Sequence, residues 1–192
     1  MARFFIDRPI FAWVIAISFV LPVTVSASGT PVAFDANPDR CAGEPRTLEQ
    51  LEDILAGATP SAPIERPATG SEINPVSEVG QGAIATIETL FACLNAGDRL
   101  RAYALYTDAY LATILQPGDL PAVATPQPND PDELTRIVAI DLHELPNHRV
   151  LATVTLDPAL IPVQKIFEFV LISSDGQWKI DAVINEIDFS LP

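Results

Sequence analysis

The stretch KIFEFVLISSDGQWKIDAVINEI, residues 165–187, decides the fold. Apolar and polar side chains alternate on both sides of Ser174-Asp175-Gly176, and a period of two is typical of strands. Asp175-Gly176 suits the tip of a tight hairpin, because aspartate and glycine tolerate the positive φ angles that such turns require. The stretch therefore predicts two antiparallel strands, at 165–173 and 177–187.

Two further strands are predicted upstream, at 134–145 and 149–156, with Pro146-Asn147-His148 as the turn between them. Before these strands, apolar side chains recur with the period of a helix, from about Gln81 to Asn95. Gly97 suits a left-handed helix cap, and Asp98 is placed to cap a second helix that runs to about Tyr106. A third helical piece at 109–116 leads into a proline-rich loop at 116–131. Helices followed by an antiparallel meander predict an α+β fold, with N-terminal helices packed on one sheet face.

The alternation also predicts which sheet face meets the helices. The expected inner set is Val138, Ile140, Leu142, Val150, Ala152, Val154, Leu156, Phe167, Phe169, Leu171, Trp178, Ile180, Ala182 and Ile184. The other face is also partly apolar, through Leu151, Ile166, Val170, Ile172 and Val183. Such a sheet needs a second cover. We expect that cover to be either a homodimer partner on the outer face or the chain's own N-terminal arm.

Three phrases resemble the nuclear transport factor 2-like, or SnoaL-like, superfamily. They are LNAGD at 94–98, LYTDAY at 105–110 and DGQWKIDAV at 175–183. The resemblance covers roughly residues 80–189 and implies a cone-shaped fold, in which a curved antiparallel sheet of about four strands wraps the helices around an apolar pocket. Members include isomerases, dehydratases, polyketide cyclases and domains without catalysis, so the fold does not name the function.

The resemblance places a set of apolar and aromatic residues on the wall of the pocket. The expected lining is Phe91, Tyr106, Val154, Phe167, Phe169, Trp178 and Ile180. Family enzymes carry an acidic residue or a histidine on this wall, whereas the inward strand positions listed above are all apolar. This difference favours a domain that binds without catalysing, so we do not expect an enzyme.

Four side chains remain weak catalytic candidates. Asp141 and His143 share one strand face, and a carboxylate that orients an imidazole is common in acid–base sites. Tyr103 and Tyr106 lie at helical spacing with Tyr110, where phenols can bind a ligand or polarise a carbonyl. The alternative for Asp141 and His143 is a position that faces solvent, and the alternative for the tyrosines is a role in the core. No spacing typical of a metal site or of a phosphate-binding loop occurs, so neither a metal nor a cofactor is expected.

The N-terminal segment predicts export. Arg3 and Arg8 precede an apolar run that ends at Pro22, and small residues follow to Ala27. This order is typical of a signal peptide, and a retained membrane anchor is the alternative. The first 17 residues resemble the N-terminus of RND-family efflux transporters of bacterial inner membranes, but no second run of spanning length follows. We interpret residues 1–27 as a targeting element only and exclude a transport function.

Residues 28–80 are predicted to form an extended arm, a short helix at 46–55 and a linker rich in proline and glycine. Thr47 and Gln50 have the spacing of a capping box at the start of that helix. In an exported chain, Cys41 and Cys93 form one possible disulfide, and two free thiols are the alternative. The net charge of −14 disfavours nucleic acid and anionic membrane surfaces as partners.

Three hypotheses follow from these observations. The leading one is an exported or cell-envelope domain at 81–192 that binds a small apolar ligand or a protein partner. The second is a small-molecule isomerase, dehydratase or cyclase with an acid–base site in the pocket. The third is a modulator of an envelope complex, anchored by residues 1–27. The polarity of the pocket distinguishes the first two, because a buried acidic residue or histidine at the cavity would favour the enzyme, whereas an apolar cavity would favour binding.

Overall fold

The computed structural model describes residues 34–61, 70–158 and 165–184. All of them belong to one compact unit, Ala33–Pro192. The targeting segment at 1–27 and the end of the last predicted strand, from residue 185, lie outside the described residues. Within those residues, no helix has both the length and the apolar character that crossing a membrane requires.

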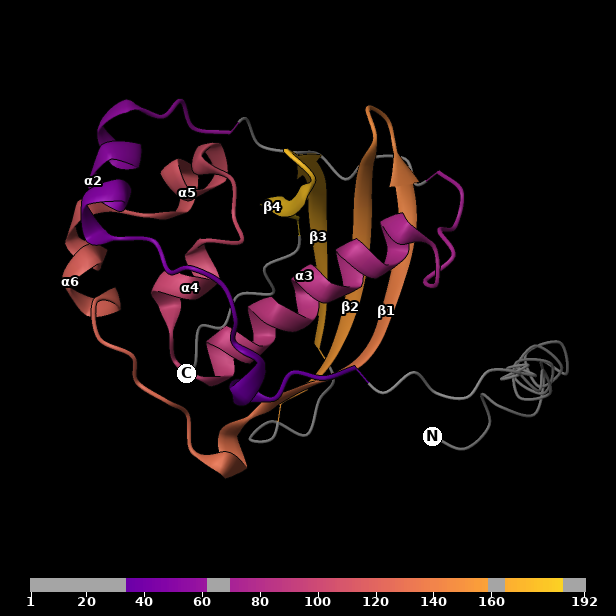
Figure 1. Cartoon of the computed structure of the whole chain (residues 1–192), viewed down its shortest axis with the longest axis horizontal. Helices are drawn as coiled ribbons and strands as arrows, with labels where there is room; N and C mark the ends of the chain where they lie inside the picture. Colours follow the sequence, from indigo (N-terminus) through magenta and orange to yellow (C-terminus); the bar gives the residue numbers. More distant parts are fainter. Residues whose placement is uncertain (1–33, 62–69, 159–164, 185–192) are drawn as a thin grey trace, which may run out of the picture. The chain divides into compact units, whose positions relative to one another are not determined.

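The described part is an α+β structure with a four-stranded antiparallel sheet, as the sequence predicts. The strands are β1 (Thr135–Leu145), β2 (Arg149–Pro158), β3 (Lys165–Ser174) and β4 (Gln177–Val183), and they neighbour one another in chain order. Figure 1 shows α3 (Glu78–Asn95) lying across one face of this sheet, while α2, α4, α5 and α6 lie to one side. The predicted hairpin turn is present, with positive φ at Asp175 and Gly176.

The core between α3 and the sheet follows the predicted alternation through β2 and β3. Val150, Ala152, Val154 and Leu156 of β2 and Phe167, Phe169 and Leu171 of β3 are all buried there. On α3 they meet a helical stripe that comprises Ala83, Ile87, Leu90, Phe91 and Cys93. Helix α3 begins at Glu78, because Ser77 accepts a hydrogen bond from the backbone N–H of Gly80 and caps it.

Bulges in the two outer strands correct the predicted faces. In β1, Ile137 pairs with Leu156 and Ala139 pairs with Thr155, so Val138 is an extra residue. Ile137 is therefore buried in the core, whereas Val138 is 46% exposed. The expectation that Val138 faces inward is wrong, because a bulge reverses the alternation locally.

In β4 the register shifts between its pairing partners Val170 and Leu171. Leu171 pairs with Ile180 and Val170 pairs with Ala182, which leaves Asp181 as the extra residue. Ala182 therefore packs in the outer cluster with Val170, and Val183 contacts the inner core. The inward assignments of Ala182 and Ile184 are wrong for the same reason, since Ile184 also packs against the outer cluster.

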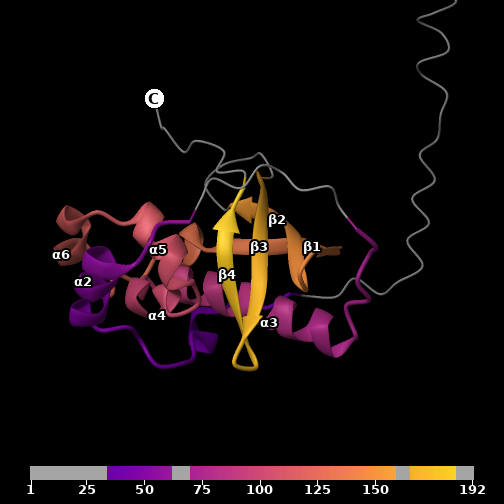
Figure 2. The same ribbon diagram turned by 90° about the horizontal axis from the view of Figure 1, so that it is seen from above.

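Both edges of the sheet are occupied by backbone from the helical half of the chain. At the β1 edge, Gly70 and Ile73 donate to the carbonyls of Glu144 and Leu142, both at 2.9 Å. At the β4 edge, Tyr106 forms a parallel bridge with Ile180. Figure 2 shows α5 (Asp108–Ile114) beside β4, and its Tyr110 packs against the outer-face residues Leu151 and Val170.

The remaining helices form a second apolar cluster. The capping box predicted at Thr47 and Gln50 is present, and it starts α2 (Leu48–Gly57). This helix buries Leu51 and Ile54 against Leu111 of α5 and against α6 (Leu120–Val123). The predicted loop at 116–131 thus contains helical turns, because Leu120 and Val123 have an apolar surface to pack on.

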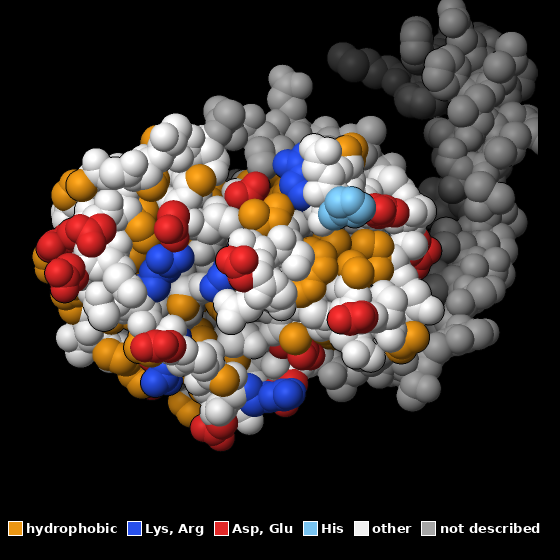
Figure 3. Space-filling view, turned by 45° about the horizontal axis from the view of Figure 1, so that its top comes forward, with side chains coloured by type: hydrophobic (Ala, Val, Ile, Leu, Met, Phe, Trp, Pro, Cys, Tyr) orange, Lys and Arg blue, Asp and Glu red, His pale blue; other side chains and the backbone are white. Residues whose placement is uncertain are grey.

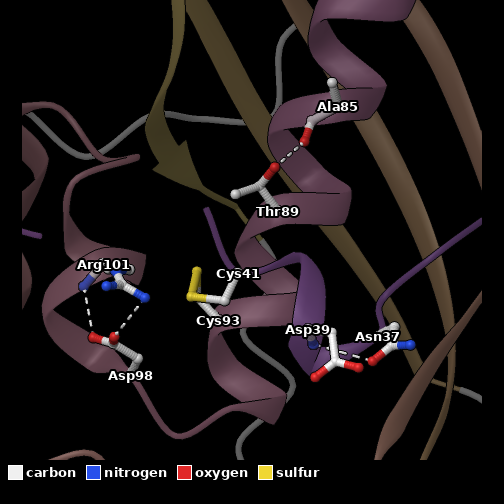
Figure 4. Close-up of a disulfide and its surroundings, with 8 residues drawn as sticks. All are labelled: Asn37, Asp39, Cys41, Ala85, Thr89, Cys93, Asp98 and Arg101. Carbon is white, nitrogen blue, oxygen red and sulfur yellow. Dashed lines mark hydrogen bonds and ion pairs between the residues drawn. A yellow bond between two sulfur atoms is a disulfide. The ribbon is translucent and has the colours of Figure 1, made fainter. Parts of the chain in front are cut away.

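The predicted disulfide between Cys41 and Cys93 is present and joins residues 52 positions apart. Cys93 lies on α3 and is fully buried, and Cys41 follows the 3₁₀ turn Pro38–Arg40 of the arm. Figure 4 shows the bond between that turn and α3. The arm thus packs against the inner core and α3, rather than on the outer sheet face. A disulfide is consistent with an oxidising, extracytoplasmic compartment.

Candidate functional site

A cavity of about 280 Å³ lies between the C-terminal half of α3 and one end of the sheet. Its volume lies just below the range of about 300–1,000 Å³ that is usual for small-molecule pockets. The lining comes from α3, from all four strands and from two connecting segments. It comprises Leu90, Phe91, Leu94, Asn95, Tyr106, Asn129, Thr135, Leu156, Lys165, Phe167, Phe169 and Val183.

Four of the residues expected at the pocket lie together at this cavity: Phe91, Tyr106, Phe167 and Phe169. Val154 and Ile180 are instead fully buried in the core and do not line the cavity. Trp178 lines a different pocket, at the other end of the sheet. All three residues share the inner face with the phenylalanines. Val154 pairs directly with Phe167 but is enclosed in the core, whereas Trp178 lies at the other pocket.

Aromatic contacts hold the apolar wall in place. The rings of Phe91 and Phe169 meet edge to face with centroids 6.1 Å apart, and Phe167 lies 6.2 Å from Phe169. Such pairs stabilise each other beyond the area that they bury. The cavity wall is therefore a packed aromatic surface that links α3 to β3.

Asn95 forms the polar end of the cavity. Its side chain is buried, and its Nδ2 donates to the carbonyls of Ala36 and Thr135 at 2.8 and 2.9 Å. Its Oδ1 accepts from the backbone N–H of Thr135 at 3.0 Å. Local sequence patterns do not predict these contacts, because the partners lie 59 and 40 positions away in the chain. The side chain in fact ties the arm and the start of β1 to α3.

We predict that Asn95→Asp lowers the free energy of unfolding by about 3 kcal/mol, because the carboxylate cannot donate to two buried carbonyls. Urea unfolding followed by circular dichroism measures the change. Asn129→Asp is the matched control, because Asn129 is exposed at the same cavity and should change stability by less than about 0.5 kcal/mol. Equal losses in the two variants would contradict the role of Asn95.

The three tyrosines lie side by side although the chain leaves the helix between them. Tyr103 ends α4 (Arg99–Tyr103), and α5 begins only at Asp108. The ring centroids of Tyr103 and Tyr106 are 6.4 Å apart, and those of Tyr106 and Tyr110 are 5.5 Å apart. Tyr106 alone among the three lines the cavity.

Two cations fix the turn that brings these rings together. Arg46 donates to the carbonyls of Tyr103 and Tyr106, both at 3.1 Å, and Lys179 donates to the carbonyl of Ala104. Cations are favourable at the carbonyl end of a helix such as α4. Desolvation lowers the pKa of Lys179, and the nearby Arg46 charge adds to this effect. Burial raises the pKa of the Tyr103 phenol.

The bulge in β4 also contributes to this turn. Thr107 caps α5 by accepting from the backbone N–H of Tyr110. Its hydroxyl donates to Oδ1 of the bulged residue Asp181 at 3.0 Å, and its backbone N–H donates to the carbonyl of Ile180 at 2.9 Å. Sequence patterns do not predict this set, because its members come from two segments of the chain, in which Thr107 and Asp181 are 74 positions apart.

Asp141 and His143 lie on β1, away from the cavity lining. Asp141 is exposed and His143 is partly buried. His143 Nδ1 is a buried atom without a hydrogen-bond partner in the structure, so Asp141 does not orient it there. In the part of the chain that the structure describes, no three histidine, cysteine or acidic side chains gather as metal ligands would.

The chain was compared with protein-family models, with curated proteins and with solved structures, and no match was found in any of the three.

Proposed function

We propose that this protein is an exported, non-catalytic binding domain that takes a small apolar ligand in the cavity between α3 and the sheet. The single observation that carries the proposal is the chemistry of the cavity wall. Eight of its twelve described residues are aliphatic or aromatic: Leu90, Phe91, Leu94, Tyr106, Leu156, Phe167, Phe169 and Val183. Burial of apolar ligand surface against such a wall is the driving force for binding.

The polar side chains at the cavity support binding rather than acid–base catalysis. Asn95, Asn129, Thr135 and Lys165 complete the described lining, which contains no carboxylate and no imidazole. The amide of Asn95 already bonds to backbone groups and holds the framework together. An isomerase or dehydratase needs a side chain that accepts and returns a proton at the substrate, and the described part of the wall supplies no acidic residue or histidine for that step.

We further propose that the domain has the cone-shaped fold of the nuclear transport factor 2-like superfamily. The order of helices and strands, the helix that lies across one sheet face and a cavity at that interface support this assignment. The disulfide supports export to a compartment where cysteines oxidise. In this proposal, residues 1–27 direct the chain to the membrane.

Titration with the neutral fluorescent probe N-phenyl-1-naphthylamine tests the proposal. We predict saturable binding that Leu94→Trp weakens at least tenfold, because Leu94 lines the cavity and is 39% exposed, so a larger ring fills the space without disturbing buried residues. Ile114→Trp is the matched control, since Ile114 is 41% exposed on α5 and lies outside the cavity lining. Its affinity should remain within twofold of the unmodified protein.

Near-ultraviolet circular dichroism verifies that both variants keep their packing. If Leu94→Trp binds the probe as tightly as the control, the cavity is not the binding site and the proposal fails. If the unmodified protein shows no saturable binding, the proposal of an apolar-ligand site fails as well.

A further inference from the structure

A second pocket, of about 490 Å³, lies at the N-terminal end of α3. It shares none of its described lining residues with the cavity above. Its walls come from the segment before α3 and from the two hairpin turns of the sheet. The lining comprises Ile73, Ser77, Glu78, Val79, Glu144, His148, Arg149, Val150, Ser173, Gly176 and Trp178.

Turn geometry fixes one wall of this pocket, and backbone hydrogen bonds to β1 fix another. The β1–β2 turn has positive φ at Asn147 and His148, which gives it a tight, defined shape. The segment before α3 is bound to β1 through Gly70 and Ile73, as described for the sheet edge. The pocket is therefore formed by structured backbone from two distant segments of the chain, 73–79 and 144–178.

The floor of the pocket is apolar and is centred on Trp178. A Cβ atom at Gly82 of α3 would lie 2.4 Å from Cδ1 and Nε1 of this indole, so the absence of a side chain at Gly82 makes room for the ring edge. Trp178 is partly buried, and Val79 beside it in the pocket is 42% exposed. The ring is thus anchored on α3 along one edge while it also lines the pocket.

The described rim carries the carboxylates of Glu78 and Glu144 against the guanidinium of Arg149, so its net charge is negative and favours a positive ligand. Glu78 and Glu144 are exposed at the pocket, and Arg149 donates to the carbonyl of Pro146 in its own turn at 3.3 Å. The chain also carries a net charge of −14, which attracts cations over longer distances. Figure 3 shows a face on which hydrophobic side chains lie beside a histidine and between acidic side chains.

We propose that this pocket binds a small organic cation with an apolar body, such as an arylalkylammonium. Its apolar part packs against Val79 and Trp178, and its ammonium group is attracted by the indole and by the carboxylates of Glu78 and Glu144. Cations bind to tryptophan more favourably than to any other aromatic side chain. This second site is independent of the apolar cavity, so either proposal can fail without the other.

Three ligands with the same carbon skeleton test the charge preference by isothermal titration calorimetry: 3-phenylpropylammonium, 3-phenylpropan-1-ol and 3-phenylpropionate. We expect the cation to bind at least fivefold more tightly than the alcohol, and the carboxylate to bind more weakly than either. The double variant Glu78→Gln/Glu144→Gln should reduce the preference for the cation over the alcohol to less than twofold. Both positions are exposed, so the isosteric change preserves the fold.

The control double variant, Glu49→Gln/Glu52→Gln, makes the same change of net charge on the exposed face of α2. It should keep the preference for the cation within twofold of the unmodified protein. Three results would overturn the proposal: equal binding of cation and alcohol, no effect of the pocket variant, or an equal effect of both double variants. The last result would assign any preference to the overall charge of the protein.

Discussion

Replacing Cys41 and Cys93 together by alanine is expected to lower the free energy of unfolding by about 4 kcal/mol. The disulfide joins positions 52 residues apart, and a cross-link of that span restricts the unfolded chain by about this amount. For a domain of this size, the loss corresponds to a fall of about 10 °C in the melting temperature. Thermal and urea unfolding of the two proteins measure the difference.

The unmodified protein in a reducing buffer is the control for this variant. It keeps both sulfur atoms, so it separates loss of the cross-link from loss of packing around Cys93, which is fully buried. We expect reduction alone to cause most of the destabilisation. The arm should then become more sensitive to proteases, since its attachment to α3 would rest on non-covalent contacts, such as the hydrogen bonds of Asp35 to Glu88 and of Asn95 to Ala36. A reducing buffer without effect on the unfolding midpoint would refute this account.

The sheet could be predicted from the sequence because its side chains alternate by face. That reading is correct throughout β2 and β3, where Val154, Phe167 and Phe169 all enter the core. It fails at Val138, Ala182 and Ile184, because each lies at or just beyond a bulge. Alternation with a period of two does not indicate where a strand carries one extra residue. In β4 the extra residue is Asp181, whose carboxylate accepts a hydrogen bond from the hydroxyl of Thr107.

The candidate site shows a different limit. The sequence indicates which residues share the inner face of the sheet. It does not show how α3 lies across that face, and therefore it does not show which inward residues line each pocket. Phe167 and Trp178 both have inward positions, yet they line pockets at opposite ends of the sheet. The role of Asn95 depends on two carbonyls whose residues lie 59 and 40 positions away, and local patterns carry no such information.

At Gly97, even the methyl group of alanine should cause one of the largest losses in the free energy of unfolding. The φ of Gly97, +65°, lies in the left-handed region, as the helix-cap pattern predicts. A Cβ atom there would lie 1.8 Å from the carbonyl oxygen of Gln127 and 2.8 Å from the nitrogen of Pro128. These are backbone atoms, and the segment is held by hydrogen bonds from Gln127 to Gly97 and from Asn129 to Asn95.

We predict that Gly97→Ala lowers the free energy of unfolding by about 3 kcal/mol, because the strain of left-handed backbone adds to the displacement of a packed segment. Gly176→Ala is the matched control. Its φ is +75°, but a Cβ atom there would meet nothing within 4 Å, so only the backbone strain of about 1 kcal/mol applies. Equal losses in urea unfolding would show that the segment at 127–129 does not pack on Gly97. A larger loss for Gly97→Ala, with weaker probe binding in the apolar cavity, would show that this packing also positions Asn129 at the cavity.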